Sequence, residues 1–225
     1  MPPGPDQLAF DLPFDVSHAR DDFLEGPCNA AALAWVERWP DWPGPVLALI
    51  GPPGSGKTHL AAIWAAASGA AMVAGSGLGA ADLPALLAHD ALVVDDLAPG
   101  RFDERALFHL LNMVREQGAF LLLTAAEPPV GWPVAIPDLA SRLRAVPTVA
   151  VAPPDDALLR AVLVKLFADR QIKVDETLVG YLVSRIERSF AAARIMVERL
   201  DREALRLQRP VTRALAVDLL RADGI

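Results

Sequence analysis

One eight-residue stretch, Gly51 to Thr58 (GPPGSGKT), constrains the fold of this chain more than any other part of it. It fits the pattern G-x-x-x-x-G-K-[ST], in which a glycine-rich loop wraps a phosphate chain. The apolar run 46–50 precedes it and the alanine-rich run 59–64 follows it. These flanks predict a short buried strand before the loop and a helix after it, which is the context that the pattern requires. An ordinary glycine-rich turn, the alternative, needs no lysine followed by a hydroxyl.

Each residue type in this stretch has a physical reason. Backbone N–H groups approach a phosphate closely where side chains are absent, which suits Gly51, Gly54 and Gly56. Lys57 is expected to reach the outer phosphates, and Thr58 to place its hydroxyl on Mg²⁺. The residues expected to contact the cofactor here are Pro53, Gly54, Ser55, Gly56, Lys57, Thr58 and His59.

The composition limits the number of domains, the cellular location and the kinds of partner that we expect for this chain. The chain has 225 residues, of which 53% are hydrophobic, enough for one α/β domain plus a small appended one. It has no apolar run long enough to cross a bilayer, and its N-terminus lacks the pattern of a signal peptide, so we expect a cytoplasmic protein that is not membrane-bound. Cys28 is the single cysteine, which excludes an intrachain disulfide. A net charge of −7 disfavours strong direct DNA binding.

A pair of carboxylates, Asp95 and Asp96, ends the apolar run 91–94. Ligands of parallel sheets lie at the carboxyl ends of the strands, where this pair would emerge beside the phosphate loop. We expect Asp95 to hold Mg²⁺, through water, and Asp96 to orient or polarise an attacking water. Two solvated turn aspartates are the alternative.

The order of predicted elements indicates the fold class. Predicted strands cover residues 46–50, 70–74, 91–97, 120–124 and 146–151, and helices lie between them. This alternation predicts an α/β fold, a P-loop NTPase with a parallel three-layer αβα sheet domain over residues 16–153. The glycine-rich segment 75–79 is expected to be flexible, and Asn29 and Asp103 are expected to cap helices. Residues 154–225 are all-helical in pattern and predict a small α-helical lid domain, with helices 155–170, 176–186, 190–207 and 212–220.

The proline-rich residues 1–15 predict an extended tail. Within it, large apolar side chains alternate with small or polar ones over residues 7–13, a pattern typical of a peptide whose side chains fill pockets on a partner. A tail that folds back onto its own domain is the alternative.

Several segments resemble the DnaA-related AAA+ ATPases. GKTHL at 56–60 and LVVDDL at 92–97 look like the GKTHL and LLIDD segments of the bacterial replication initiator DnaA and its relatives. Residues 23–29 resemble the family's adenine-side turn before the first helix, and the resemblance covers roughly residues 20–222. It implies ADP or ATP with Mg²⁺ as cofactors, and it assigns four residues to the adenine side of the nucleotide: Phe23, Leu24, Gly26 and Asn29.

Because of its N-terminal tail, the chain resembles one group within this family in particular, the Hda-like regulatory inactivators of DnaA. In that family an N-terminal Gln-Leu-x-Phe/Leu-x-Leu-Pro peptide docks on the sliding clamp of DNA polymerase III. The match assigns Gln7, Leu8, Phe10 and Leu12 to pockets of the clamp. The resemblance therefore implies DnaA and the clamp as partners, with a homo-oligomer left open. It also implies promotion of the hydrolysis of DnaA-bound ATP, and so negative regulation of replication initiation.

Two arginines match positions at which the family has arginines that contact phosphate groups. Arg142, in Ala-Ser-Arg-Leu, matches the arginine finger that enters a neighbouring subunit's nucleotide site. Arg188, in Glu-Arg-Ser-Phe, matches the lid's sensor arginine, which touches the phosphates of its own nucleotide. The alternative for each is a structural ion pair.

The chain departs from the family after the predicted strand 120–124, where the family usually offers a polar or acidic sensor. Here Ala126 stands in that region and cannot position a water, so either Thr124 substitutes or intrinsic hydrolysis is weak. We therefore expect an ATPase fold that turns over little ATP alone and acts mainly as an activator.

Three other functions fit parts of this pattern. A self-contained AAA+ ATPase of the helicase-loader type predicts turnover by the chain alone and oligomerisation driven by ATP. A P-loop kinase is disfavoured, because the predicted helical bundle over residues 155–222 offers no basic lid with an acceptor pocket. The third is an adaptor in which the nucleotide only fixes the angle between the two domains.

Overall fold

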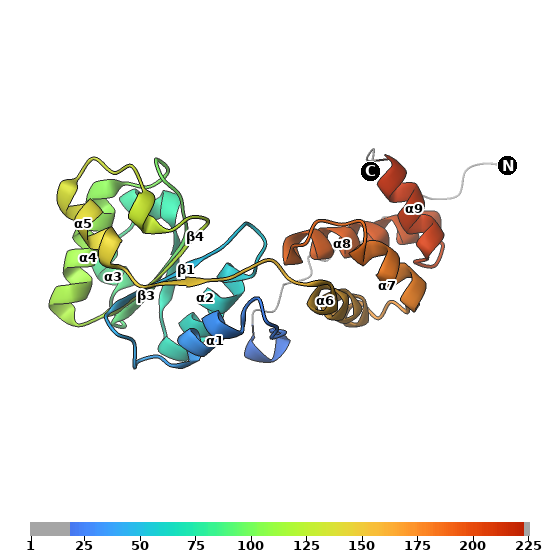
Figure 1. Cartoon of the computed structure of the whole chain (residues 1–225), viewed down its shortest axis with the longest axis horizontal. Coiled ribbons are helices and arrows are strands. Elements are labelled where there is room, and N and C mark those ends of the chain that lie inside the picture. The colour runs from blue at the N-terminus through green and yellow to red at the C-terminus, as the bar shows by residue number, and fades with distance from the viewer. Residues whose placement is uncertain (1–18, 223–225) are drawn as a thin grey trace.

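A computed structural model of the chain describes residues 19–222, which form two lobes (Figure 1). The first lobe is a β-sheet flanked by helices, and the second is made of the four helices α6 to α9. The predicted docking tail, with Gln7, Leu8, Phe10 and Leu12, lies outside the described residues. None of the helices within residues 19–222 is long and apolar enough to cross a membrane.

The sheet has five parallel strands in the order β2-β3-β4-β1-β5. The strands are β1 (Val46–Ile50), β2 (Ala71–Ala74), β3 (Ala91–Leu97), β4 (Phe120–Ala125) and β5 (Thr148–Ala150). Ile50 at the end of β1 pairs with Ala125 and Ala150, and Leu97 of β3 also pairs with Ala125. The ends of β1 and β3 therefore meet at one edge of the sheet, as the sequence predicted for the loop and the carboxylate pair.

Helices cover both faces of the sheet, which confirms the predicted three-layer αβα class. Strand side chains alternate between the faces, so Leu47 and Leu49 pack with α1 and α2, while Ala48 and Ile50 pack with α4 and α5. The helical segments of this lobe are η1 (Arg20–Asp22), α1 (Ala30–Glu37), α2 (Lys57–Ser68), η2 (Gly75–Ala80), α3 (Leu83–Leu86), α4 (Glu104–Gln117), η3 (Pro129–Gly131) and α5 (Pro137–Ala145).

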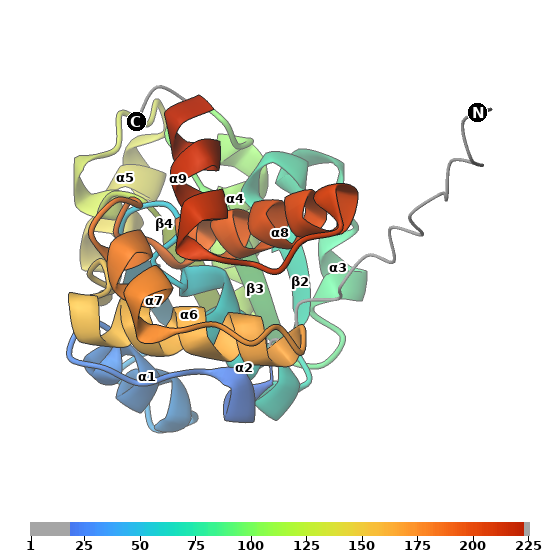
Figure 2. The same ribbon diagram turned by 90° about the vertical axis from the view of Figure 1, so that its right-hand side faces the viewer.

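The helical lobe has its own core, built from apolar residues of all four of its helices. They are α6 (Asp156–Asp169), α7 (Glu176–Val183), α8 (Phe190–Leu207) and α9 (Arg213–Ala222). Pro153 and Pro154 lie between β5 and α6. Figure 2 shows this lobe, which we call the lid, turned toward the viewer in front of the sheet.

One local expectation is wrong. The glycine-rich segment expected to be flexible lies in η2, with Leu78 fully buried. A Cβ on Gly75 would lie 2.9 Å from a methyl of Leu97, and one on Gly79 would lie 2.9 Å from the Cβ of Asp103. These glycines therefore allow close packing against the sheet domain, in place of mobility.

Candidate functional site

The phosphate loop joins β1 to α2 and needs glycine at several points. Gly54 and Gly56 have φ angles of +73° and +96°, the left-handed region that side chains disfavour. A Cβ on Gly51 would lie 2.1 Å from the Val151 carbonyl oxygen. Glycines at these positions therefore let the backbone turn tightly in front of the N-terminus of α2.

Lys57, the first residue of α2, folds back over this loop. Its Nζ donates hydrogen bonds of 2.7 Å to the Gly51 carbonyl and 2.9 Å to the Pro52 carbonyl. The side chain is buried, and burial lowers the pKa of the ammonium group, although the nearby carboxylates of Asp96 and Asp95 oppose that shift. A buried cation gains from an anionic partner, which the loop itself does not supply.

Ser55 adds a second sign that the loop fits an anion. Its hydroxyl is buried at 1% exposure of the residue and has no hydrogen-bond partner within the described residues. Unpaired buried polar groups are rare in folded proteins, and a bound group is one explanation. The glycine backbone, the buried ammonium and this hydroxyl together fit a phosphate chain.

The carboxylate of Asp95 lies between two threonine hydroxyls. Thr124 of β4 donates a hydrogen bond of 2.6 Å to it, and Thr58 of α2 donates one of 3.0 Å. Hydroxyl and carboxylate oxygens are ligands that suit Mg²⁺, which keeps several waters and takes phosphate oxygens as well. Within residues 19–222 no group of three or more His, Cys, Asp or Glu side chains could hold a metal ion. Thr58 and Asp95 would therefore hold the ion together with phosphates and water.

Asp96 lies at an irregularity of β3. The strand register shifts between Val94 and Leu97, and Asp96 has a φ of 55° with an exposed side chain. Its N–H donates a 2.9 Å hydrogen bond to the Thr124 hydroxyl, while Ala126 is exposed beyond the end of β4. A bulge of this kind re-aims a side chain next to a functional site. Thr124 is thus the polar residue that β4 brings to this edge.

A cleft of about 520 Å³ runs from the phosphate loop to the lid. Its volume is in the range of small-molecule sites. The sheet domain lines it with Asp22, Phe23, Leu24, Gly54, Gly56, Lys57, Thr58 and His59, and the lid with Val162, Lys165, Leu166, Asp169, Arg170, Phe190, Ala191 and Arg194. Of the predicted cofactor residues, Gly26, Asn29, Pro53, Ser55 and Arg188 do not line it.

Asn29 shapes the turn at the far end of this cleft. It occupies the predicted N-cap position of α1, but its side chain makes no capping hydrogen bond to the helix. Its Oδ1 instead accepts a 2.8 Å hydrogen bond from the Gly26 N–H, and its Nδ2 donates one of 3.0 Å to the Leu24 carbonyl. The neighbouring Phe23 ring meets His59 edge to face at 5.1 Å. Asn29 and Gly26 therefore position Phe23 and Leu24 without facing the cleft themselves.

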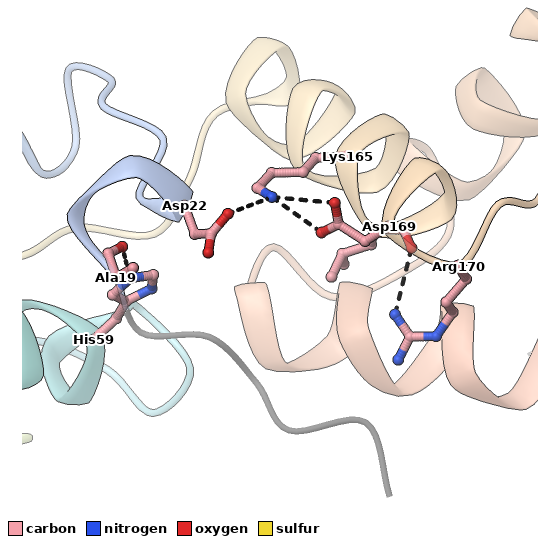
Figure 3. A network of polar contacts seen from close by, with 7 residues as sticks. Ala19, Asp22, His59, Lys165, Asp169 and Arg170 are labelled. Atoms are coloured by element: carbon pink, nitrogen blue, oxygen red, sulfur yellow. Dashed lines mark hydrogen bonds and ion pairs between the residues drawn. The ribbon is translucent and has the colours of Figure 1, made fainter. Parts of the chain in front are cut away.

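A polar network crosses from the sheet domain to the lid at the mouth of the cleft (Figure 3). Lys165 of α6 donates hydrogen bonds to Asp22 of η1 at 2.8 Å and to Asp169 at 3.0 Å. These hydrogen bonds raise the pKa of Lys165. Beside them, His59 Nε2 lies 3.1 Å from the Ala19 carbonyl oxygen. The N-terminal segment therefore contacts both the lid and the helix that begins at the phosphate loop.

The start of α8 packs directly on the phosphate loop. The Phe190 N–H donates a 2.8 Å hydrogen bond to the Gly54 carbonyl, and the Phe190 ring would lie 3.3 Å from a Cβ on Gly56. A Cβ on Gly54 would lie 2.9 Å from the Cβ atoms of Ser189 and Ala191. The lid therefore contacts the sheet domain in two places, at the phosphate loop through the start of α8 and at η1 through Lys165.

The structure places Arg188 away from the cleft. Its guanidinium pairs with the Asp156 carboxylate at 2.9 Å, and both side chains are exposed. The lid arginines that line the cleft are Arg170 and Arg194, which the sequence analysis did not single out. Arg194 lies one helical turn after Phe190, so the two side chains share a face of α8. This i, i+4 spacing could have indicated from the sequence that Arg194 faces the same side as Phe190.

Arg142 lies on α5 and faces a different part of the molecule. Its guanidinium is 5.1 Å from the centre of the Phe108 ring, and it lines a groove together with Pro45 and Val46, where β1 begins. The phosphate loop follows the other end of this five-residue strand, so the two sites are separated by about 16 Å along β1. Arg142 is therefore not placed to reach the phosphate loop of its own chain.

The strand order, the loop after β1, the carboxylates on β3 and the helical lid define the fold of an AAA+ P-loop NTPase. Solved structures agree with this assignment. Domain III of the replication initiation protein DnaA from Thermotoga maritima matches with a TM-score of 0.75 at 18% identity, over 94% of this chain and 98% of that chain.

Two further matches are with longer chains. AMPPCP-bound DnaA from Aquifex aeolicus gives a TM-score of 0.64 at 16% identity, over 82% of this chain and 65% of that chain. The RuvB Holliday junction branch migration motor of Thermotoga maritima gives a TM-score of 0.61 at 18% identity, over 78% of this chain and 61% of that chain. No protein-family model matches the sequence. At these identities the likenesses establish the fold.

Proposed function

We propose that this chain binds ADP or ATP, with Mg²⁺, in the cleft between its sheet domain and its lid. The support is the phosphate loop, which contains a buried lysine and a buried serine hydroxyl with no hydrogen-bond partner within residues 19–222, and which lines one part of a cleft of about 520 Å³. Thr58 and Asp95 would hold the ion, and Phe23 and Leu24 would flank the adenine. The bound nucleotide would supply the anion that the loop lacks.

We further propose that the nucleotide-bound chain is a negative regulator of chromosome replication initiation. It would dock on the sliding clamp of DNA polymerase III through Gln7, Leu8, Phe10 and Leu12, and promote hydrolysis of DnaA-bound ATP in the manner of the Hda-like inactivators. The observation that carries this proposal is the position of Arg142, which is remote from its own phosphate loop in a chain whose fold spans 98% of DnaA domain III.

Arg142 would act on the nucleotide of a neighbouring DnaA molecule. Water attacks the γ-phosphorus, the bond from that phosphorus to the bridging oxygen breaks, and ADP and phosphate leave. A guanidinium near the phosphates stabilises the negative charge that develops on these oxygens. Docking on the clamp would raise the effective concentration of this contact, so the contact itself can be weak.

A reconstituted assay tests this function directly. Labelled ATP bound to DnaA is mixed with clamp, DNA and this chain, and the release of phosphate is followed. The wild-type chain should accelerate hydrolysis. Arg142→Ala should lose about 10³-fold or more of that acceleration, as removal of an arginine finger does. Arg144→Ala, which removes an exposed arginine of the same helix, is the matched control and should stay active. A fully active Arg142→Ala chain would contradict the finger assignment.

Docking on the clamp needs its own experiment. The double variant Gln7→Ala with Phe10→Ala should no longer be retained on immobilised clamp, because both pocket-filling side chains are truncated. It should still stimulate DnaA when a large excess of chain replaces the tether. Undiminished retention would contradict the docking assignment of the tail.

A self-contained ATPase of the helicase-loader type is the second candidate. The observation in its favour is that Thr58, Asp95 and Thr124 are joined by hydrogen bonds at the edge that also carries Asp96, so the elements of a hydrolytic site are together. This candidate predicts appreciable ATP turnover by the chain alone and oligomers that form with ATP. Slow turnover and an oligomeric state unaffected by ATP would instead favour the regulator.

A further inference from the structure

A second groove, of about 390 Å³, lies at the edge of the sheet where β1 and β5 begin. It is lined by Pro43, Gly44, Pro45, Val46, Leu111, Arg115, Arg142, Ala145, Val146 and Pro147. Two of these residues are charged, and both are arginines: Arg115, in the last turn of α4, and Arg142 of α5. The other lining residues are proline, glycine, alanine, valine and leucine, none of which has a charged side chain.

Neither arginine forms an ion pair with another of the residues 19–222 that the structure describes. The ion pairs within residues 19–222 include Arg20, Arg160, Arg188, Arg202 and Arg206, but not Arg115 or Arg142. Arg142 is half-buried over the Phe108 ring and Arg115 is exposed. Two cations that share one groove repel each other, and an anion bound between them relieves this repulsion. The groove therefore favours the binding of a negatively charged group from outside the chain.

We propose that Arg115 is a second phosphate-binding residue of the surface that carries Arg142, and that both contact the triphosphate held by a neighbouring AAA+ subunit. This inference rests on the proposed function. A triphosphate carries several negative charges, so each guanidinium group can pair with a charged oxygen of its own, whereas a single carboxylate brings one charge to both. The chain's own nucleotide is excluded as the ligand, because its phosphate loop lies about 16 Å away along β1.

The two arginines would have separable roles. Arg142 stabilises charge that develops during hydrolysis, so its removal lowers the maximal rate. Arg115 contacts the phosphate chain before and during the reaction, so its removal weakens association. A contact of equal strength in the ground state and the transition state changes the concentration for half-maximal effect and leaves the maximal rate unchanged. Arg115 is thus a substrate-binding residue for the proposed reaction.

The experiment titrates the chain against DnaA loaded with labelled ATP and records the rate of hydrolysis at each concentration. Arg115→Ala should raise the half-maximal concentration about tenfold, the loss expected for one charge-assisted contact, with the maximal rate within about twofold of wild type. Arg115→Lys should recover part of the loss. Arg105→Ala is the control, since it removes an exposed arginine of the same helix that does not line the groove.

Salt dependence supplies a readout that a merely structural role would not move. Raising the salt concentration should weaken association of the wild-type chain more steeply than that of Arg115→Ala, because the variant lacks one of the screened contacts. If Arg115→Ala and Arg105→Ala behave alike while the wild-type chain is active, this inference is overturned and the proposed function stands. If the wild-type chain fails to stimulate hydrolysis at any concentration, the proposed function is overturned and the inference with it.

Discussion

The Thr124 hydroxyl donates a 2.6 Å hydrogen bond to the carboxylate of Asp95. Thr124 lies on β4 and is buried at 1% exposure, and Asp95 lies on the neighbouring β3. The bond turns the carboxylate toward Thr58, whose hydroxyl is 3.0 Å away on the helix that follows the phosphate loop. A side chain of the adjacent strand thus positions the carboxylate that we propose as a Mg²⁺ ligand.

Replacing this threonine by its isostere tests that arrangement. Thr124→Val should lower the free energy of unfolding by about 1–3 kcal/mol, because it removes the hydrogen bond to Asp95 and leaves the Asp96 N–H without its acceptor. It should also reduce the part of ATP affinity that depends on Mg²⁺. Urea unfolding and ATP titrations with and without Mg²⁺ measure both effects. Thr124→Ser keeps the hydroxyl and should keep the Mg²⁺-dependent ATP affinity, so an equal loss of that affinity in the two variants would contradict the account.

Gly54 permits a comparison that separates backbone strain from contact with the lid. Gly54 and Gly100 have nearly equal φ angles of +73° and +72°, but a Cβ meets Ser189 and Ala191 at 2.9 Å only in the first case and nothing within 4 Å in the second. Both alanine variants should lose about 1–2 kcal/mol of stability from the left-handed backbone.

Gly54→Ala should be the less stable of the two and should bind nucleotide at least about tenfold more weakly, because its methyl group pushes the start of α8 off the phosphate loop. Calorimetric titration with ADP measures this. Gly100→Ala should retain the wild-type affinity. Equal nucleotide affinity in both variants would show that the contact between Gly54 and the lid does not matter for binding.

Lys165 tests the network at the mouth of the cleft. Lys165→Met should cost less than about 1 kcal/mol of stability, because the ion pair with Asp22 is partly exposed. It should, however, release ADP several-fold faster, because the N-terminal segment and the lid lose their link. Stopped-flow measurement with a fluorescent ADP checks this, with Lys173→Met, an exposed lid lysine, as the control. Identical release rates would contradict a role for the network.

The pH dependence of the same contact follows from the raised pKa of Lys165. A lysine with a raised pKa contributes stability below its ordinary value of 10.5 and loses it as the pH rises beyond that value. The difference between wild type and Lys165→Met should therefore be constant from pH 7 to 9.

Arg194 and Arg188 are the two lid arginines that we compare as candidates for contact with the phosphates of the bound nucleotide. Arg194 lines the cleft, whereas Arg188 pairs with Asp156. Arg194→Ala should weaken ATP affinity about tenfold, the loss expected for one charge-assisted contact, and Arg188→Ala should leave it within about twofold. Equilibrium titration with ATP compares them. The reverse order would support the role that the sequence predicted for Arg188.

The fold could be predicted from the sequence because its signals are local. The loop pattern, the apolar runs of four to seven residues and the double proline before α6 each depend on neighbouring residues alone, and the strands lie where these predict. The meeting of the loop with Asp95 also followed from sequence, because parallel strands end at one edge.

The lid's part of the site could not be predicted in the same way. Which arginine faces the cleft depends on how α8 is rotated against the phosphate loop, and that rotation is set by Phe190 packing on Gly56 and bonding to Gly54. Likewise the segment 75–79 has a flexible composition, but Leu78 anchors it in the core. Contacts between residues far apart in sequence decided both cases.

Binding of ADP and ATP to the purified chain, measured by calorimetry with Mg²⁺ present, tests the central claim most directly. The wild-type chain should bind at least one of them, and Lys57→Met should bind on the order of a hundredfold more weakly, because two charge-assisted contacts to phosphate are lost. A wild-type chain with no affinity for either nucleotide would contradict the account.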